Sequence, residues 1–283
     1  RDFPIKCLLH RDSAIIMLSY RHAFHVGNHA DVLKHCVLLA CLRHMLRKDK
    51  PFLYIDTHAG AGCYDLGDAR TLANAEFQNG IAKVLNRDPS APPDALADYA
   101  EVIRSFNSSD SHNCYPGSCA IAARVMRSRD QLRLHELHST EFKNLQDWAG
   151  SDPRILCLRK DGLRGMVKAC PPASRRGLVL VDPSYEIKED YESVPAAVED
   201  ALRKFASAVI LVWYPLLSSA RHVEMKRRLE QCAGGNWLNA ELRVRGSRDG
   251  MYGSGMWAIN PPWDLATRFE KTHASPPELL GEE

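Results

Sequence analysis

The feature of this chain that most constrains its fold is a series of short apolar runs, each closed or soon followed by an acid. The acids are Asp56, Glu136, Asp161 and Asp182. Such runs suit strands that are buried on both faces of a parallel sheet, and stretches with helical periodicity separate them. Strands that alternate with helices predict an α/β fold with a mostly parallel, doubly wound sheet. Ligands bind beyond the carboxyl ends of such strands, so we expect the acids to surround one crevice.

The apolar pattern also predicts the order of the elements. Residues 30–47 carry apolar side chains at helical spacing, which predicts an amphipathic helix that ends before Pro51. Two late runs, joined by a glycine-containing segment, predict an antiparallel hairpin at the edge of the sheet. We expect strands at residues 52–56, 132–136, 155–158, 177–182, 209–214, 238–244 and 255–259, and further helices at residues 119–126 and 220–231.

Residues 66–115 interrupt the alternation of strands and helices. They hold two helical stretches on either side of a proline-rich linker at residues 88–93. Because the segment is short and both its ends return to the same core, we expect a helical insertion subdomain and not an independent domain. Residues 1–16 lack the pattern of a signal peptide, and Met17 suits a natural start. The expected division is a disordered extension at residues 1–16, a main domain at residues 17–65 and 116–265, the insertion at residues 66–115, and a polar tail at residues 266–283.

Length and composition exclude several classes of protein. The chain has 283 residues, of which 45% are hydrophobic and 25% are charged, and this composition is typical of a packed globular domain. No apolar stretch approaches the roughly 20 residues that span a bilayer, so we expect no membrane partner. The net charge of +2 decides little, because a nucleic-acid site would need positive charge that is concentrated locally.

The nine cysteines do not have the pattern of a disulfide framework. Their number is odd, no Cys-x-x-Cys pair occurs, and several, such as Cys36, Cys41 and Cys157, lie in or beside apolar runs. Free thiols in such places behave as small hydrophobic side chains. We therefore expect reduced cysteines and a cytoplasmic protein.

The first candidate binding element is the turn after the first predicted strand. Asp56 ends the strand, and Gly60 and Gly62 follow in a Gly-x-Gly turn, where the backbone can approach a ligand closely. The turn lacks the third glycine of a dinucleotide site, and no Gly-Lys-Ser/Thr sequence of a phosphate-binding loop follows it. A ligand without a pyrophosphate, such as S-adenosylmethionine, is therefore favoured over NAD. Glu136 is placed to accept the ribose hydroxyls of such a ligand.

The second element consists of Asp182, Pro183, Ser184 and Tyr185, directly after a strongly apolar strand. It is similar to the Asp/Asn-Pro-Pro-Tyr/Phe tetrapeptide of amino-methylating enzymes, with Ser184 in place of the second proline. The amine of adenine is a poor nucleophile because its lone pair is delocalised into the ring. Acceptors at the Asp182 carboxylate and the Pro183 carbonyl would localise that lone pair and aim it at a methyl sulfonium. The ring of Tyr185 would offer a flipped-out base a surface for stacking.

The third element is the histidine-rich segment at residues 20–35. It interleaves basic and aromatic side chains, among them Tyr20, Arg21 and Phe24, and this pattern favours contacts with RNA. A metal site is disfavoured because no His-Glu-x-x-His pattern occurs. A basic rim formed by Arg175, Arg176, Arg243, Arg245 and Arg248 would extend the RNA surface.

Together these motifs resemble those of the bacterial 23S rRNA (adenine-N6)-methyltransferase family known as RlmJ. The resemblance runs from Met17 to about Trp263, and its distinctive strings are residues 19–22, 27–35, 56–62, 115–118, 175–177 and 213–215. It implies a Rossmann-like, S-adenosylmethionine-dependent methyltransferase fold with a small helical insertion. It also implies a monomer that methylates 23S ribosomal RNA and uses no metal.

The resemblance further implies roles for single residues. Asp182 matches the family's catalytic acid, which accepts the amine proton. Tyr20 matches a residue that touches the RNA substrate, and His22 lies close to it. The matches to the family's S-adenosylmethionine contacts are His35, His58, Ser118, Glu136, Asp161 and Gly162, and Lys34 lies beside them.

Two other functions stay open at this point. A DNA adenine-N6 methyltransferase shares the tetrapeptide, although the segment at residues 66–115 is small for a target-recognition domain. A non-catalytic RNA-binding module on a methyltransferase fold would be favoured by loss of Asp182 or of the Gly-x-Gly turn, and both are present. We expect an enzyme that methylates the N6 amine of a specific adenine in 23S ribosomal RNA.

Overall fold

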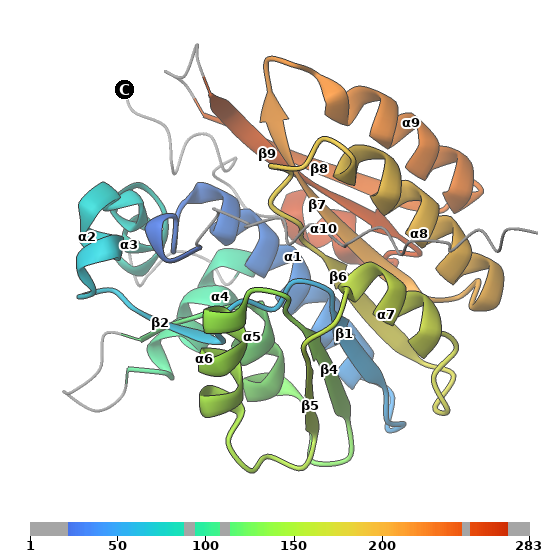
Figure 1. The fold of residues 1–283 in the computed structure, drawn as a ribbon, viewed down its shortest axis with the longest axis horizontal. Helices are drawn as coiled ribbons and strands as arrows, with labels where there is room; N and C mark the ends of the chain where they lie inside the picture. Colours follow the sequence, from blue (N-terminus) through green and yellow to red (C-terminus); the bar gives the residue numbers. More distant parts are fainter. Residues whose placement is uncertain (1–21, 88–93, 108–113, 245–249, 271–283) are drawn as a thin grey trace, which may run out of the picture.

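The central sheet confirms the predicted α/β fold (Figure 1). The protein is seen in a computed structural model that describes residues 22–87, 94–107, 114–244 and 250–270. The first five strands of the sheet are parallel, and β9 pairs antiparallel with both β7 and β8, which confirms the predicted edge hairpin. The order across the sheet is β5 (Ile155–Leu158), β4 (Gln131–His135), β1 (Leu53–Asp56), β6 (Gly177–Val181), β7 (Val209–Leu217), β9 (Met251–Ile259) and β8 (Trp237–Arg243).

Helices cover both faces of this sheet (Figure 1). Because side chains alternate along a strand, β6 contributes Leu178 and Leu180 to one apolar cluster and Val179 and Val181 to the other. Both faces of β6 are therefore buried, as its continuous apolar sequence predicted. One layer holds α1 (His29–Leu46), α5 (Ser118–Val125), α6 (Ser139–Ala149) and α10 (Leu265–Glu270), and the other holds α7 (Gly162–Ala169), α8 (Asp190–Lys204) and α9 (Arg221–Ala233).

Helix α1 is buried on nearly all sides, whereas its periodicity predicted an amphipathic helix. Of its 18 residues, 14 are buried, including the polar residues Asp31, Lys34 and His35. The reason is that α1 packs on the sheet and also contacts the helices α4 (Ala95–Arg104), α5 and α10. Asn28 begins the helix by accepting hydrogen bonds from the first free N–H groups. Neither α1 nor any other helix of the described ranges is long and apolar enough to cross a membrane.

The segment between β2 (Cys63–Asp65) and β3 (Cys114–Pro116) contains most of the remaining helices. These are α2 (Ala69–Asn74), the 3-10 helix η2 (Glu76–Asn79), α3 (Ile81–Leu85) and α4. Strands β2 and β3 pair antiparallel in a small sheet of their own. Side chains of this segment pack on α1 in a third apolar cluster, and the predicted linker at residues 88–93 lies outside the described residues.

The C-terminal part of the described chain is more structured than its composition predicted. We expected a polar tail from residue 266, but residues 266–270 belong to α10, which packs on α1. Leu265 is buried at the start of this helix, and Arg268 pairs with Asp264 at 3.0 Å. A few apolar contacts are enough to hold so short a helix. The expected extension at residues 1–16 and the rest of the tail lie outside the described residues.

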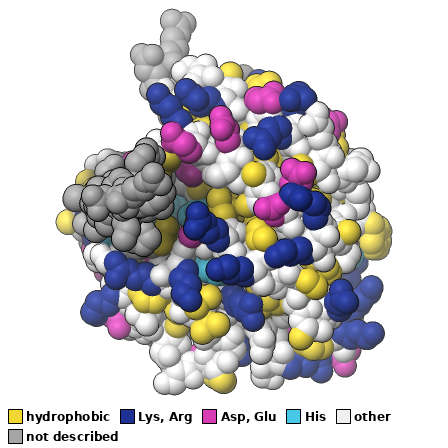
Figure 2. All heavy atoms as spheres, turned by 45° about the vertical axis from the view of Figure 1, so that its right-hand side comes forward, with side chains coloured by type: hydrophobic (Ala, Val, Ile, Leu, Met, Phe, Trp, Pro, Cys, Tyr) yellow, Lys and Arg dark blue, Asp and Glu magenta, His cyan; other side chains and the backbone are white. Residues whose placement is uncertain are grey.

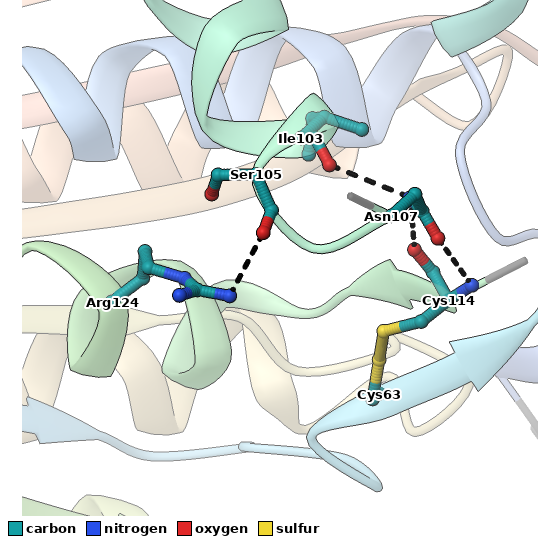
Figure 3. Close-up of a disulfide and its surroundings, with 6 residues drawn as sticks. All are labelled: Cys63, Ile103, Ser105, Asn107, Cys114 and Arg124. Atoms are coloured by element: carbon teal, nitrogen blue, oxygen red, sulfur yellow. Dashed lines mark hydrogen bonds between the residues drawn. A yellow bond between two sulfur atoms is a disulfide. The ribbon is translucent and has the colours of Figure 1, made fainter. Parts of the chain in front are cut away.

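A disulfide between Cys63 and Cys114 contradicts the expectation that all cysteines are reduced. The bond joins β2 to β3, and Asn107 braces it by accepting a hydrogen bond from the Cys114 N–H at 2.9 Å (Figure 3). The two cysteines are 51 residues apart, and the pairing of β2 with β3 is what brings them together. The other cysteines of the described ranges are free, as expected: Cys36, Cys41, Cys119, Cys157, Cys170 and Cys232.

We expect Cys63→Ser to lower the free energy of unfolding by about 2–4 kcal/mol without reductant, because the bond restricts the unfolded chain. Unfolding in urea, followed by circular dichroism, measures this loss. Cys157→Ser removes a free thiol and serves as the control, with a much smaller effect. The wild type in reductant should unfold like Cys63→Ser. If reductant leaves the stability of the wild type unchanged, the two thiols are not joined in solution.

Candidate active site

A cavity of about 340 Å³ opens beyond the carboxyl ends of β1, β4, β6 and β7. Its volume is in the range of small-molecule sites. Two of the four acids at strand ends, Glu136 and Asp182, line it, whereas Asp56 is fully buried. The predicted site residues that line the cavity are His22, Lys34, His35, His58, Gly60, Ser118, Glu136, Asp182 and Pro183.

Four side chains form a chain of buried contacts along one wall. Lys34 Nζ lies 2.8 Å from Asp182 Oδ2 and 2.8 Å from Asp31 Oδ1. The other oxygen of Asp31 accepts hydrogen bonds from His22 Nε2 at 3.0 Å and from the Gly27 N–H at 2.8 Å. Asp31 and Lys34 share one face of α1 because they are three residues apart, and Asp182 follows β6. Lys34 therefore ties the start of α1 to the end of β6.

Burial and charge together set the pKa values of Asp182, Lys34 and Asp31. Burial raises the pKa of Asp182 to about 6, although Lys34 partly offsets the rise. Burial would lower the pKa of Lys34, but the carboxylates of Asp182 and Asp31 outweigh it and raise that pKa. Burial would raise the pKa of Asp31, but His22 and Lys34 hold it well below its usual value. Of the two acids beside Lys34, Asp182 is therefore the one whose pKa lies nearer to neutral pH.

Asp56 holds the first turn from behind the cavity. Its carboxylate accepts hydrogen bonds from the Tyr54 hydroxyl at 2.7 Å, the Ser118 hydroxyl at 2.6 Å and the His58 N–H at 3.3 Å. These bonds fix Ser118, the first residue of α5, in the cavity wall. Burial lowers the pKa of His58 to about 4, so its imidazole is neutral at physiological pH.

The Gly-x-Gly turn contacts Glu136 directly. The Gly60 N–H donates to Glu136 Oε2 at 3.0 Å, and the His138 N–H donates to Oε1 at 2.7 Å. A carboxylate oxygen has two lone pairs, so each oxygen keeps acceptor capacity for a ligand hydroxyl. Gly60 has a φ of +62°, and a Cβ there would lie 2.2 Å from the Tyr64 hydroxyl, so the turn requires glycine. Burial raises the pKa of Glu136.

Three predicted cofactor contacts lie outside the cavity lining. A Cβ on Gly62 would lie 2.5 Å from the ring of Trp148, and a Cβ on Gly162 would lie 2.0 Å from the Thr57 carbonyl oxygen. Both glycines thus permit close packing of the turn. Asp161 is exposed and caps the start of α7. The structure gives these residues packing and capping roles, and their contact with a cofactor stays a prediction.

His35 is held by two buried tyrosines, to which the sequence assigned no role, although Tyr115 begins the family string at residues 115–118. Its Nδ1 lies 3.2 Å from the Tyr99 hydroxyl and 3.1 Å from the Tyr115 hydroxyl, and the two hydroxyls are 2.7 Å apart. Both hydroxyl protons find an acceptor within this trio only if Nδ1 accepts one of them. Burial also lowers the pKa of His35 to about 3. We therefore infer a neutral imidazole that carries its proton on Nε2.

The tetrapeptide after β6 is only partly arranged as predicted. Pro183 lines the cavity beside Asp182. Tyr185 does not, which contradicts its predicted place as a stacking surface for a base. Its φ of +55° turns the ring into the core, where it is 6% exposed and packs against Tyr191. The Tyr185 hydroxyl donates to the Trp213 carbonyl at 2.9 Å, which holds the ring there.

The N-terminal histidines are engaged by acids. His25 Nδ1 lies 2.9 Å from a carboxylate oxygen of Glu76, and this hydrogen bond raises the pKa of His25. The ring of His22 meets the edge of the Tyr64 ring, with 5.3 Å between centroids. Within the described ranges, no group of three or more His, Cys, Asp or Glu side chains is arranged to hold a metal. Tyr20 lies outside the described residues, and an RNA contact of His22 stays a prediction.

Of the arginines in the predicted basic rim, the three that the structure describes do not lie together. Arg175 and Arg176 directly precede β6, at the amino ends of the parallel strands, whereas the cavity lies at their carboxyl ends. Arg176 donates to two backbone carbonyls there. Arg243 pairs with a glutamate of its own strand at 3.2 Å. Arg245 and Arg248 lie outside the described residues. Figure 2 shows lysine and arginine side chains spread over one face, with acidic side chains among them.

Among the residues that line the cavity without having been assigned a role from the sequence, Asp31 and Trp213 matter most. Asp31 had a usable signal, because it is an acid in a mainly apolar helix, three residues before Lys34. Trp213 lines the cavity and belongs to the family string at residues 213–215, but the apolar sequence of β7 gives it no role that differs from that of a core residue.

Fold and site together define a Rossmann-like methyltransferase: a doubly wound sheet, a glycine turn after β1, an acid after β4 and an Asp-Pro pair after β6. The family model described as "Ribosomal RNA large subunit methyltransferase D, RlmJ" matches residues 49–276. The chain belongs to this family of ribosomal RNA methyltransferases, as its motifs predicted.

Relatives of this chain match it over nearly their whole length. A protein of Escherichia coli named "Ribosomal RNA large subunit methyltransferase J" is 42% identical, with 88% of this chain and 89% of that protein covered. A protein of Haemophilus influenzae with the same name is 38% identical, with 90% and 91% covered. A crystal structure of a Legionella pneumophila protein is 34% identical, with a TM-score of 0.80 and with 90% and 96% covered.

We expect His35 to keep its proton on Nε2 at neutral and mildly acidic pH, because burial lowers its pKa to about 3 and a tyrosine donates to Nδ1. Nitrogen NMR shifts of labelled histidine report the tautomer. Tyr99→Phe and Tyr115→Phe each keep one donor and should keep the tautomer, whereas the double variant should give a mixture. A proton on Nδ1 in the wild type would contradict the inferred hydrogen-bond pattern.

Proposed function

We propose that this protein transfers a methyl group from S-adenosylmethionine to the N6 amine of an adenine in 23S ribosomal RNA. The observation that carries this proposal is the carboxylate of Asp182, which lines the cavity beside Pro183 and pairs with the buried Lys34. Membership of the family supports RNA as the substrate, since the relatives in E. coli and H. influenzae are named ribosomal RNA methyltransferases.

The chemistry of the cavity lining fits S-adenosylmethionine. Glu136 keeps acceptor capacity for two ribose hydroxyls, and Gly60 lets the backbone come close to the nucleoside. The Nε2–H of His35 is a donor of fixed position for an acceptor such as the carboxylate of the amino-acid part. His58 and Ser118 add hydrogen-bonding groups to the same wall. We keep Lys34, Gly62, Asp161 and Gly162 in the proposed binding set, because they flank these residues.

The protein's own groups would activate the target amine. The Asp182 carboxylate and the Pro183 carbonyl each accept one N–H of the amine, which draws its lone pair out of the adenine ring. When bound, S-adenosylmethionine supplies an electrophilic methyl group on a positively charged sulfur. Asp182 then accepts the proton that the methylated nitrogen releases.

Lys34 keeps Asp182 in the form that can accept hydrogen bonds. A buried carboxylate favours protonation, and a nearby cation favours the charged form. With its ammonium 2.8 Å from both acids, Lys34 offsets the burial of Asp182 and Asp31 at once. The same contact fixes the Asp182 oxygen in place, so the amine meets an acceptor that needs little reorganisation.

We also propose that the enzyme works in the cytoplasm as a monomer, without a membrane partner. Ribosomes assemble in the bacterial cytoplasm, where the substrate would be met. We propose residues 66–115 as a helical subdomain that places Tyr99 and Tyr115 behind His35.

Transfer of labelled methyl from S-adenosylmethionine to purified large-subunit rRNA, compared with DNA and followed by nucleoside analysis, tests the proposed activity. We expect N6-methyladenosine from the RNA alone. Asp182→Ala should lower the rate by about a hundredfold or more, because it removes an acceptor and the proton's destination. Asp147→Ala, which removes an exposed acid of α6, is the control and should keep full activity.

Other outcomes of this assay would point elsewhere. Methyl transfer to DNA alone would replace RNA by DNA as the substrate. Tight binding of S-adenosylmethionine with no transfer to either nucleic acid would indicate a binding module on a methyltransferase fold. Full activity of Asp182→Ala would remove the observation on which the proposal rests.

We expect kcat/KM for rRNA to be constant above about pH 6 and to fall about tenfold per pH unit below it. The sign follows from Asp182, whose raised pKa means that the accepting carboxylate is lost as the pH falls through about 6. Lys34→Gln should move this limb to higher pH, because the ammonium lowers the pKa of Asp182. Lys143→Gln, at an exposed position, should leave it in place. A limb near pH 4 in the wild type would contradict the assignment to Asp182.

A further inference from the structure

The aromatic residue of the tetrapeptide is turned away from the cavity. Tyr185 is buried, its ring packs 4.6 Å from that of Tyr191, and its hydroxyl donates to a backbone carbonyl of β7. To reach the cavity, this ring would have to give up its hydrogen bond and its packing. A base held beside Asp182 therefore needs another flat surface.

Trp213 stands where such a surface is needed. Strands β6 and β7 are parallel, and Val181 is paired with Val212. Asp182 and Trp213 each come directly after one of these paired residues, so they are neighbours across the two strands. Trp213 is partly exposed and lines the cavity together with Asp182 and Pro183.

The wall that continues from Trp213 is apolar. Pro215 and Leu217 of β7 and Met251 of β9 line the cavity beyond it. Glu136, His58 and Ser118 come from the β1–β4 side, and Asp182 follows β6, which lies between β1 and β7 in the sheet. The two halves of the cavity thus differ in chemistry. A flat, weakly polar base fits the apolar half, and a ligand with many hydroxyl groups fits the other.

Tyr185 and Trp213 are also connected to each other. Their ring centroids lie 6.1 Å apart, in addition to the hydrogen bond from the Tyr185 hydroxyl to the Trp213 carbonyl. The buried Nε1 of Trp213 meets no acceptor in the part of the chain that the structure describes. The orientation of the indole is therefore set by packing, and Tyr185 is one of the side chains that set it.

We propose that Trp213 is the residue on which the target adenine stacks, and that Tyr185 is a positioning residue that supports it from the core. This inference rests on the proposed function. Base stacking on an aromatic ring contributes to nucleic-acid binding without reading sequence, and a bicyclic indole offers a purine a surface of matching size. Trp213 would orient the plane of the base, while Asp182 and Pro183 select its amine edge.

The direct test is quenching of tryptophan fluorescence by adenosine monophosphate, in the presence of S-adenosylhomocysteine. We expect quenching in the wild type and in Trp237→Phe, which removes a tryptophan stacked on Trp257 away from the cavity lining. Trp213→Phe should bind the nucleotide but lose most of the quenching. Quenching that survives in Trp213→Phe, or that never occurs in the wild type, would overturn the proposal.

Methyl transfer gives a second, independent comparison. We expect Trp213→Leu to lower kcat/KM for rRNA by about ten- to a hundredfold, with Trp213→Phe within about threefold of the wild type, because a ring is what stacking requires. The affinity for S-adenosylmethionine, measured by calorimetry, should stay within about twofold, which a general structural defect would not allow. Unchanged kcat/KM in Trp213→Leu would overturn the proposal.

The losses of kcat/KM for rRNA in variants of Trp213 and Tyr185 show on which ring the base stacks. If it stacks on Trp213, Tyr185→Phe keeps the packing and changes kcat/KM little, and Tyr185→Leu lowers kcat/KM less than Trp213→Leu does. The reverse order would make Tyr185 the stacking residue and sink the inference. A wild type that binds the nucleotide through Trp213 but transfers no methyl to rRNA would instead count against the proposed function.

Discussion

The ammonium of Lys34, set between Asp31 and Asp182, is the interaction on which the rest of the site depends. A lysine can be buried in the apolar helix α1 only because two carboxylates flank it, and each carboxylate is buried at acceptable cost only because the lysine is there. Removing one partner from such a pair typically costs about 3–5 kcal/mol, because an uncompensated charge stays behind. One contact therefore joins the main helix to the central strand and fixes the carboxylate at the cavity.

The frame of the molecule was predictable because it follows from local rules. The five parallel strands came from short apolar runs, and β6 showed its burial on both faces through an unbroken series of Gly, Val and Leu. Glu136 and Asp182 could be assigned to one crevice because the carboxyl ends of parallel strands lie at the same end of the sheet, whereas Asp56 is buried behind the cavity and Asp161 caps α7 outside its lining. Gly60 was predictable for the same kind of reason, since a turn that brings backbone close to a ligand excludes a Cβ.

What escaped prediction depends on contacts between distant segments. The periodicity of α1 could not show that α4 and α10 would also pack against it, because a helix covered on several sides and one with a single apolar face share many positions. The pairing of Cys63 with Cys114 depends on how β2 meets β3. The inward turn of Tyr185 depends on a positive φ and on an acceptor in another strand, and neither is encoded in its tetrapeptide. Motif similarity therefore located the acid correctly and misplaced the ring beside it.

Three interactions join the two ends of the helical insertion. They are the pairing of β2 with β3, the Cys63–Cys114 bond, and a hydrogen bond of 2.8 Å from the Gly117 N–H to the Gly62 carbonyl. The glycine turn and the start of α5, which border the cavity, are thus held at a fixed separation by bonds that do not pass through the insertion. The segment between them is therefore a closed loop, although it also packs on α1 and reaches His35 through Tyr99. A cut in its backbone would leave the two cavity walls covalently joined through Cys63 and Cys114. The separation of the walls thus does not depend on the length of this segment, whereas the setting of His35 depends on its Tyr99.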